Sequence, residues 1–552
     1  MVEVIASKQL DHHGIVAGVI ADLGLQELID SRLTQGSSTK ISHGQAIAAM
    51  LINCLGFTSR PLTLTPQFFE SKAVDVLFGE AIEASDFNRH RLGRCLDAIS
   101  TYGCDELFSE LAQHVCRQEG ISQQFISLDT SSFSVTGDYD SASDAHTIAL
   151  THGYSKAHRP DLKQMVLELL VSQDGGVPLA SKSFSGNASD NAIFKARCEA
   201  LIEQLKASEG PSYLVADSKL YSKSNADNLS ALPFITRIPR RLKEEQAVVN
   251  EALASADWST FDEANQWACH HCTHYGITQR WLVVYSNAAH ARAKKTLEKH
   301  IKKEREAINS ALKQLRNQAF RCEPDARKAF TQLEKRLTFH CLVDKHIQPK
   351  AHYQSKGRPK SGELPTHYSY RATAKLAEDN AKQKQFTDEK SCYVIGTNIA
   401  PEQLSAEQVI QAYKRQNASI ERGFRFLKDP YFFAQSFFIK KPSRLMALLM
   451  LMTLALVVYS IAQRRLRQAL QENKATLPNQ INQPTEKPTL RWVFQMLEGI
   501  SIVYLKTENQ IKKTMTGLDQ LKAKIINLFS EKIVAFYLFG KNTKSCEEMC
   551  SM

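Results

Sequence analysis

Residues 124–135 read QFISLDTSSFSV, in which apolar and polar side chains alternate as they do along a β-strand. Strand and helix patterns continue from there to residue 239. In chain order they are two strands, a helix, a strand that ends at Asp217, a polar helix and a last strand; the quoted segments are LKQMVLELLVS (162–172), VPLASKSFSGN (177–187), DNAIFKARCEALIEQLKA (190–207), SYLVADSKLY (212–221) and PFITRIP (233–239). This order predicts a mixed α/β sheet domain.

The pattern is then interrupted and resumes. Residues 240–391 hold a strand pair around YGITQRWLVVYS (275–286) and a long basic helical region. Strand character returns at CYVIGTNI (392–399), and the long helix AEQVIQAYKRQNASIERGFRFLK (406–428) follows. In that helix Ile420, Phe424 and Leu427 are expected to face the core. Together the segments predict an RNase-H-like α/β core with a β-containing insertion.

Helical patterns dominate both ends of the chain. GIVAGVIADLGLQELIDSRL (14–33) has apolar residues at helical spacing, Ser42 can cap the next helix, and a third helix starts near Asn88. Such a helical domain binds DNA or serves as a packing or dimerisation module, and the pattern leaves both open. The predicted division is an N-terminal helical domain, the first part of the core, a basic insertion, the second part of the core and a C-terminal helical region, at 1–118, 119–239, 240–391, 392–470 and 471–552.

Charge is concentrated in the insertion. The 552 residues carry a formal net charge of +11, and Arg292 to Lys360 hold 19 Lys and Arg against 7 Asp and Glu, a surplus of 12. The rest of the chain therefore sums to about −1. Such a concentration is typical of a surface that binds a polyanion. The alternative is a solvated helical hairpin with long basic side chains.

Cysteine usage and apolar runs bear on location. Twelve cysteines lie without a pairing framework and no signal segment opens the chain, which indicates a reducing cytoplasm. Leu445 to Ala462 is apolar all round and long enough to be a membrane span. Basic residues flank both of its ends and two hydroxyl residues interrupt it, so we predict a buried core helix and no membrane contact.

Three carboxylates stand where metal-dependent phosphoryl chemistry would need them. Asp129 lies in the first strand, Asp217 at the end of the buried strand, and Glu421 on the late helix. Mg²⁺ prefers oxygen ligands held on rigid elements, so the three would form a metal site. A lone aspartate at a strand end is more often a turn or cap residue, so it is the combination that predicts the site.

Several segments resemble successive blocks of bacterial insertion-sequence DDE transposases, in the branch related to the insertion-sequence-four superfamily. They are LDTSSFSVTGDY (128–139), THGYSKAHRPDLKQMVLELLV (151–171), LASKSFSGNASD (179–190), LVADSKLYSKSN (214–225) and SIERGFRFLKDP (419–430). The opening LDHHGIVAGVIADLGLQELID (10–30) is similar to the helical N-terminal domain of such proteins. The resemblance covers nearly the whole chain.

This resemblance implies a function and a catalytic triad. The family residues fall on Asp129, Asp217 and Glu421, with Mg²⁺ as cofactor and Mn²⁺ as a substitute. The expected activity is cleavage at the ends of an insertion sequence and strand transfer into target DNA, by a homodimer on paired ends, in the nucleoid. An RNase-H-fold nuclease or an inactive DNA-binding relative is the alternative function.

The superfamily also has a signature of Tyr, Arg, Glu and Lys on the glutamate helix. Tyr413 and Lys428 are the candidates here; Tyr413 lies one residue farther from the glutamate than the signature requires, and Asn417 stands in place of the arginine. Arg415 is an alternative. Residues expected to contact DNA are Lys428, Tyr413, Arg415, Arg425, Lys156, Arg159, Lys294, Lys295, Lys302 and Lys303.

Two further motifs are weaker. CHHCTH (269–274) offers zinc ligands but lacks a second ligand pair, so we predict no zinc site. If excision passes through a DNA hairpin, an aromatic ring must hold a flipped base. Trp258, Trp267 and Trp281 are candidates, with core packing as the alternative role of each.

Overall fold

The computed structural model describes residues 3–36, 39–57, 61–136, 139, 147–155, 159–189, 193, 197, 212–255, 257–354, 361–362, 364–429, 439, 441–508 and 510–538. The chain divides into two compact units. The first unit comprises Met1–Thr236, Asn398–Ala400 and Gln408–Met552; the second comprises Arg237–Thr397 and Pro401–Glu407.

The sheet of the first unit has the strand topology of the RNase-H fold. Its strands are β2 (Phe125–Val135), β3 (Lys163–Ser172), β4 (Pro178–Ser185), β5 (Tyr213–Ala216) and β6 (Phe234–Arg237). Their spatial order is β4-β3-β2-β5-β6; β2, β3 and β4 pair antiparallel, whereas β2, β5 and β6 pair parallel. The predicted fold class is confirmed, and so is each strand predicted in this region. Of the helix predicted at 190–207, only Ile193 and Arg197 belong to the described residues.

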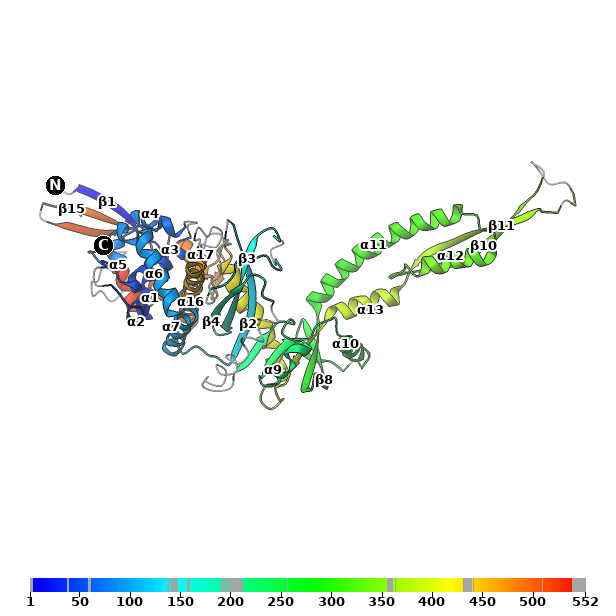
Figure 1. The fold of residues 1–552 in the computed structure, drawn as a ribbon, viewed down its shortest axis with the longest axis horizontal. Coiled ribbons are helices and arrows are strands. Elements are labelled where there is room, and N and C mark those ends of the chain that lie inside the picture. Colours follow the sequence, from blue (N-terminus) through cyan, green and yellow to red (C-terminus); the bar gives the residue numbers. More distant parts are fainter. Residues whose placement is uncertain are drawn as a thin grey trace. The chain divides into compact units, whose positions relative to one another are not determined.

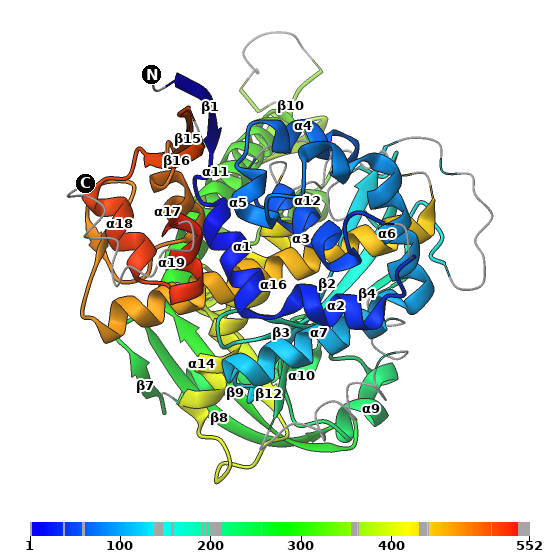
Figure 2. The same ribbon diagram turned by 90° about the vertical axis from the view of Figure 1, so that its left-hand side faces the viewer.

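A long apolar helix covers strand β4 of this sheet. Helix α16 (Pro442–Glu472) contacts β4 on one side and helices α1, α3, α6 and α7 on the other (Figure 2). It is the one helix in the described part of the chain that is long and apolar enough to cross a membrane, and 89% of its most apolar stretch is buried. The Ser181 and Thr453 hydroxyls hydrogen-bond at 3.3 Å between β4 and α16. The prediction of a core helix is confirmed.

The N-terminal residues form short helices, as predicted. Their bounds are α1 His13–Asp22, α2 Leu25–Arg32, α3 His43–Cys54, η1 Leu62–Leu64, α4 Thr65–Glu70, α5 Val74–Phe78, η2 Ala84–Phe87, α6 Arg89–Tyr102 and α7 Cys104–Glu119. Ser42 caps α3: its hydroxyl accepts from the Gln45 backbone N–H at 3.0 Å, and the Gln45 side chain accepts from the Ser42 backbone N–H at 2.9 Å. This reciprocal pair satisfies two backbone donors that a helix start leaves open.

The C-terminal region is helical, as predicted, and it also contains strands. Its elements are β13 Leu477–Pro478, β14 Pro484–Thr485, α17 Leu490–Met496, β15 Ser501–Lys506, β16 Ile511–Thr516, α18 Gln520–Asn527 and α19 Glu531–Leu538. Strand β15 pairs antiparallel with β16 and with β1 (Glu3–Gln9), so this small sheet joins the two ends of the chain. The sequence pattern did not predict this sheet.

The second unit contains the basic insertion. Its elements are α10 Lys243–Ser255, β7 Ser259–Asp262, β8 Asn265–His274, β9 Ile277–Ser286, α11 Asn287–Asn317, α12 Glu323–Glu334, β10 His340–His352, β11 His367–Glu378, α13 Asn380–Ser391 and β12 Cys392–Thr397. Helices α11 and α12 pack against the β10–β11 hairpin (Figure 1). Ile308, Leu315, Phe330 and Leu333 are among the buried residues of their shared core. A separate core explains how this segment folds within an insertion.

A buried ion cluster fastens α16 to the N-terminal helices. Arg465 pairs with Asp22 and with Glu119, both at 2.7 Å, and the side chains are only 19%, 10% and 10% exposed. Burial by itself lowers the pKa of Arg465, but its hydrogen bonds to Glu119 and Asp22 outweigh that effect and raise it. The guanidinium is therefore held charged by two partners.

We expect Arg465→Met to destabilise the first unit strongly. Removal of the cation leaves two mostly buried carboxylates uncompensated, which costs about 3–5 kcal/mol. Urea unfolding followed by far-UV circular dichroism measures the loss. The control is Arg32→Met, which removes the exposed Arg32–Glu110 pair and should change stability little. Equal losses in the two variants would contradict the prediction.

Candidate active site

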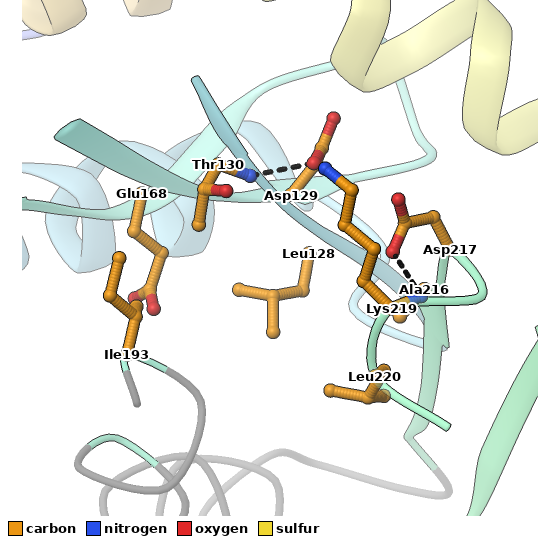
Figure 3. Close-up of a pocket in the computed structure, with 9 residues that line it drawn as sticks. All are labelled: Leu128, Asp129, Thr130, Glu168, Ile193, Ala216, Asp217, Lys219 and Leu220. Carbon is orange, nitrogen blue, oxygen red and sulfur yellow. Dashed lines mark hydrogen bonds between the residues drawn. The ribbon is translucent and has the colours of Figure 1, made fainter. Parts of the chain in front are cut away.

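Asp129 and Asp217 occupy neighbouring positions on adjacent parallel strands. Leu128 of β2 pairs in register with Ala216 of β5, so the next residue on each strand is an aspartate. Side chains at matching positions of parallel strands point to the same face of the sheet. The structure thus brings together the first two predicted site residues (Figure 3).

Backbone hydrogen bonds hold both carboxylates. The Thr130 backbone N–H donates to Asp129 Oδ1 at 2.7 Å, and the Lys219 backbone N–H donates to Asp217 Oδ1 at 2.9 Å. The Thr236 hydroxyl of β6 donates to the Asp217 carbonyl at 2.9 Å, which ties the end of β5 to the next strand. An Asp that bonds a backbone N–H two residues on forms a local turn that fixes its side chain.

The two aspartates line a cavity of about 30 Å³. That volume accommodates a water or an ion and is too small for a nucleotide. Carboxylate oxygens are the ligands that Mg²⁺ and related hard cations prefer. The Asp129 and Asp217 carboxylates therefore fit a divalent cation in donor chemistry, whereas Leu128, Ile193 and Leu220 make much of the cavity itself apolar.

Two charged residues near the aspartates were not predicted from the sequence. Glu168 of β3 pairs in register with Thr130, so its side chain lies on the opposite face of the sheet from Asp129; it is 1% exposed and accepts from Arg197 Nε at 2.9 Å. Burial raises the pKa of Glu168, against the opposing charge of Arg197. The Lys219 side chain extends toward the Asp129 carboxylate (Figure 3). A charged residue inside the apolar run VLELLV was the available signal for Glu168.

The late helix is interrupted by a π turn. It consists of α14 (Ala406–Gln416), the π turn η4 (Asn417–Glu421) and α15 (Arg422–Leu427). Ile420, Phe424 and Leu427 are buried, as predicted, whereas Glu421 is exposed. The π turn contacts β2 and β3. Single π turns inside α-helices occur frequently at functional sites.

Glu421 is not among the residues that line the cavity of the two aspartates. Among the described residues, no three His, Cys, Asp or Glu side chains come close enough to form a metal site. Four other aspartates of the region, which the sequence places in turn-like or capping contexts, lie outside the described residues: Asp138, Asp140, Asp144 and Asp190.

Lys428 lies against the strand that carries Asp129. Its ammonium donates to the Ser131 hydroxyl at 2.5 Å and lies 5.3 Å from the centre of the Phe133 ring. Ser131 and Phe133 are two and four residues after Asp129, so all three side chains share one face of β2. The helix that carries Glu421 thus packs on the face of the sheet that holds the aspartates.

Two of the predicted DNA contacts meet in a second, larger cavity. Arg415 and Arg425 line a space of about 550 Å³ together with four more basic residues, Arg422, Arg467, Lys487 and Arg491. Asp429 is the one acidic residue among the residues lining it, and it pairs with Arg491 at 2.5 Å. Burial lowers the pKa of Arg467, and the nearby charge of Arg422 adds to this effect. The cavity has a large excess of positive charge.

The remaining predicted contacts are spread over the chain. Arg159 is exposed and pairs with Asp161 at 2.7 Å, Lys156 lies outside the described residues, and Tyr413 on α14 is partly buried. Four of the six lysines of α11 are predicted contacts, and these four, Lys294, Lys295, Lys302 and Lys303, are all exposed.

The CHHCTH segment and two of the three candidate tryptophans, Trp267 and Trp281, lie on strands of the second unit. Cys269 and Cys272 lie three residues apart on β8, so their side chains point to opposite faces of the strand. Trp281 is 1% exposed and donates to Gln279 Oε1 at 3.1 Å, which assigns it to core packing. Trp258 and Trp267 are partly buried.

Comparison with known proteins shows the family of the chain. Residues 121–458, more than half of the chain, match the family model described as "Transposase DDE domain". Residues 5–113 match "Domain of unknown function (DUF4277)". A search of curated proteins returned no match. Among solved structures, the cryo-EM structure of the piggyBac transposase synaptic complex with hairpin DNA is 9% identical, with 88% of this chain and 78% of that chain covered, at a TM-score of 0.35.

Proposed function

The chain belongs to the transposase DDE domain family, whose members cut DNA and transfer strands with divalent metal ions, and we propose that it moves an insertion sequence with Asp129, Asp217 and Glu421 as its catalytic carboxylates. The observation that carries this proposal is the pair of aspartates at matching positions of adjacent parallel strands. Glu421 is proposed as the third carboxylate because its helix packs on the face of β2 that holds Asp129.

We propose Mg²⁺ as the cofactor, with Mn²⁺ as a substitute. The ion would be held by Asp129 and Asp217, with Glu421, and when bound it polarises the scissile phosphate and activates the attacking oxygen. The protein contributes fixed carboxylates: the bonds from the Thr130 and Lys219 backbone N–H groups leave little freedom to either aspartate. Rigid placement of this kind keeps reacting groups aligned.

The reaction proposed is hydrolysis at the insertion-sequence ends followed by attack of the freed 3′-OH on target DNA. Neither step needs a covalent bond between protein and DNA. Lys428 is proposed to hold a phosphate near the cut end as a point charge. Its position beside Ser131, on the strand of Asp129, supports that role.

We assign the chain to the branch related to the insertion-sequence-four superfamily. The π turn η4 supports the assignment because it lies between Tyr413 and Glu421 and adds one residue to the helix. That extra residue offsets the longer spacing from Tyr413 to Glu421. The π turn does not explain why Asn417 stands where the signature has an arginine. Arg415, which lines the larger cavity, is proposed to supply that positive charge.

We propose that the arginine-lined cavity of the first unit contacts DNA and that the lysines of α11, in the second unit, do so separately. An excess of guanidinium groups suits phosphate oxygens, which accept paired hydrogen bonds. We propose that the protein acts in the nucleoid as a homodimer that holds two ends together.

A cleavage assay tests the proposal. Purified protein should nick duplex DNA that carries the inverted repeats flanking its own gene, at the repeat boundary and with a free 3′-OH, when Mg²⁺ or Mn²⁺ is present. Scrambled repeats should stay intact. Cutting without regard to the repeats would favour the nuclease alternative, and binding without cutting would favour the inactive relative.

The lysines of α11 should act through phosphates. We expect the quadruple Lys→Gln variant at 294, 295, 302 and 303 to bind all duplexes more weakly and to flatten the salt dependence, by up to about 0.9 in log–log slope for each phosphate that the variant no longer neutralises. Fluorescence anisotropy at several salt concentrations measures the slope. The control neutralises four exposed lysines of the first unit, Lys441, Lys474, Lys506 and Lys512. An unchanged salt slope would mean that these lysines do not contact phosphates and that α11 is a solvated helix.

A further inference from the structure

A third cavity lies in the N-terminal helical domain, the part that matches the domain of unknown function. Its volume is about 520 Å³, and it opens between the loop after α2 and the start of α6. Its charged lining residues are Lys40, Asp86, Arg91 and Arg94. Three cations against one carboxylate leave a surplus of two positive charges.

Arg91 is the unusual member of this lining. It is only 4% exposed, and its Nε donates to the Ile41 carbonyl at 3.1 Å. Its buried Nη2 has no hydrogen-bond partner among the described residues. A buried cation with an unused donor is costly unless an anion completes its hydrogen bonds.

The two carboxylates near Arg91 already accept hydrogen bonds from other groups. Asp86 pairs with Lys40 at 2.8 Å and accepts from the Glu83 backbone N–H at 2.8 Å. Asp30 accepts from the Gly44 backbone N–H at 2.6 Å and contributes only a minor opposing charge at Arg91. Burial lowers the pKa of Arg91 and outweighs that charge.

The start of α6 adds to the positive field. Asn88 caps this helix by accepting from the backbone N–H groups of His90 and Arg91, at 3.2 and 3.1 Å. No acidic residue lies in its first turn, although acidic side chains are favoured there because a helix start carries partial positive charge. Cations gathered at a helix start favour a bound anion.

We propose that this cavity binds a phosphate group, with the Arg91 guanidinium as its buried donor and Arg94 at its exposed rim. The surplus of positive charge among the lining residues suits a phosphate, and the planar guanidinium of arginine can donate two parallel hydrogen bonds to phosphate oxygens. The phosphate comes from the DNA backbone, an assignment that rests on the proposed function, or from a free phosphate or nucleotide. The domain of unknown function would then anchor DNA outside the catalytic core.

The helix offers a matched set of variants. Arg94→Gln removes a charge from the rim at an exposed position, and Arg91→Lys keeps the buried charge but loses the fork. Arg89→Gln is the control, because Arg89 is exposed, starts the same helix and does not line the cavity. Circular dichroism checks that each full-length variant is folded.

Two measurements separate the sources of phosphate. In the first, anisotropy with duplex DNA, we expect Arg94→Gln to reduce the salt slope by about 1, Arg91→Lys to weaken binding with little change of slope, and Arg89→Gln to leave both unchanged. In the second, sodium phosphate or pyrophosphate is compared with chloride at equal ionic strength for its effect on Tm. A Tm rise in wild type and Arg89→Gln only, with unchanged DNA slopes, identifies free phosphate as the ligand.

The proposal is overturned if Arg94→Gln and Arg91→Lys match Arg89→Gln in both measurements. Failure of the proposed transposase function has a different signature. In that case the inverted-repeat cleavage assay is negative, while the phosphate-dependent Tm shift and its loss in the two cavity variants remain.

Discussion

Asp217→Asn should bind inverted-repeat DNA as tightly as the wild-type protein and fail to cut it. Asn preserves the shape of the side chain and an oxygen that can accept from the Lys219 N–H, so the turn after β5 should persist. What is lost is one negative charge at a cavity shared with Asp129. Metal-dependent stabilisation is worth several kcal/mol, so cleavage should fall by about 10³-fold or more.

The measurement is a gel-based cleavage assay beside a binding titration of the same duplex. Asp227→Asn is the matched control, because Asp227 is an exposed residue of α9 (Ala226–Ser230) outside the cavity. It should cut normally. Chelation of divalent ions should silence the wild type, and Mn²⁺ should restore it. Normal cutting by Asp217→Asn would remove this residue from the site.

The core could be predicted from the sequence because its signals are local. Strand β2 alternates apolar and polar residues and β3 is a nearly continuous apolar run, and the structure buries most residues of both strands. Their order, with β5, was enough to predict that Asp129 and Asp217 meet at one place. The domain boundaries stay predictions, as do the roles of the three carboxylates.

Other features have no local signal. Strands β1 and β15 pair across almost the whole length of the chain, and the exposed residues of β1 show no buried face. Strand pairing depends on partners more than on intrinsic preference, so a single segment does not reveal it. The π turn at Asn417–Glu421 is hidden for another reason: the apolar spacing of residues 406–428 also fits an uninterrupted helix.

Glu168 shows a third reason why the sequence could not predict part of the structure. A single acid in an apolar strand looked like an exception to the pattern, and its partner Arg197 lies on a segment far along the chain. Only the fold brings the two together. Buried charges are retained where they are paired, so the pair is visible only once the structure is known.

Variants of the helix that carries Glu421 should distinguish loss of cleavage from loss of DNA binding. Glu421→Gln is expected to bind inverted-repeat DNA at least as well as wild type, because one negative charge beside the DNA is gone. Its cleavage should fall by about 10³-fold or more, the loss expected for a metal-binding carboxylate. Lys428→Ala should show the opposite pattern, with weaker assembly on the ends and residual cleavage at high protein concentration.

The structure sharpens this comparison. Lys428 donates to Ser131 beside Asp129, so its loss removes a hydrogen bond to the catalytic strand as well as a charge. Lys428→Arg keeps the charge and should retain most DNA binding. This result would distinguish a contact with a DNA phosphate from the hydrogen bond that Lys428 makes to Ser131. Glu472→Gln, at the exposed end of α16, is the control for removal of an acid. Normal cutting by Glu421→Gln would remove Glu421 from the proposed metal site.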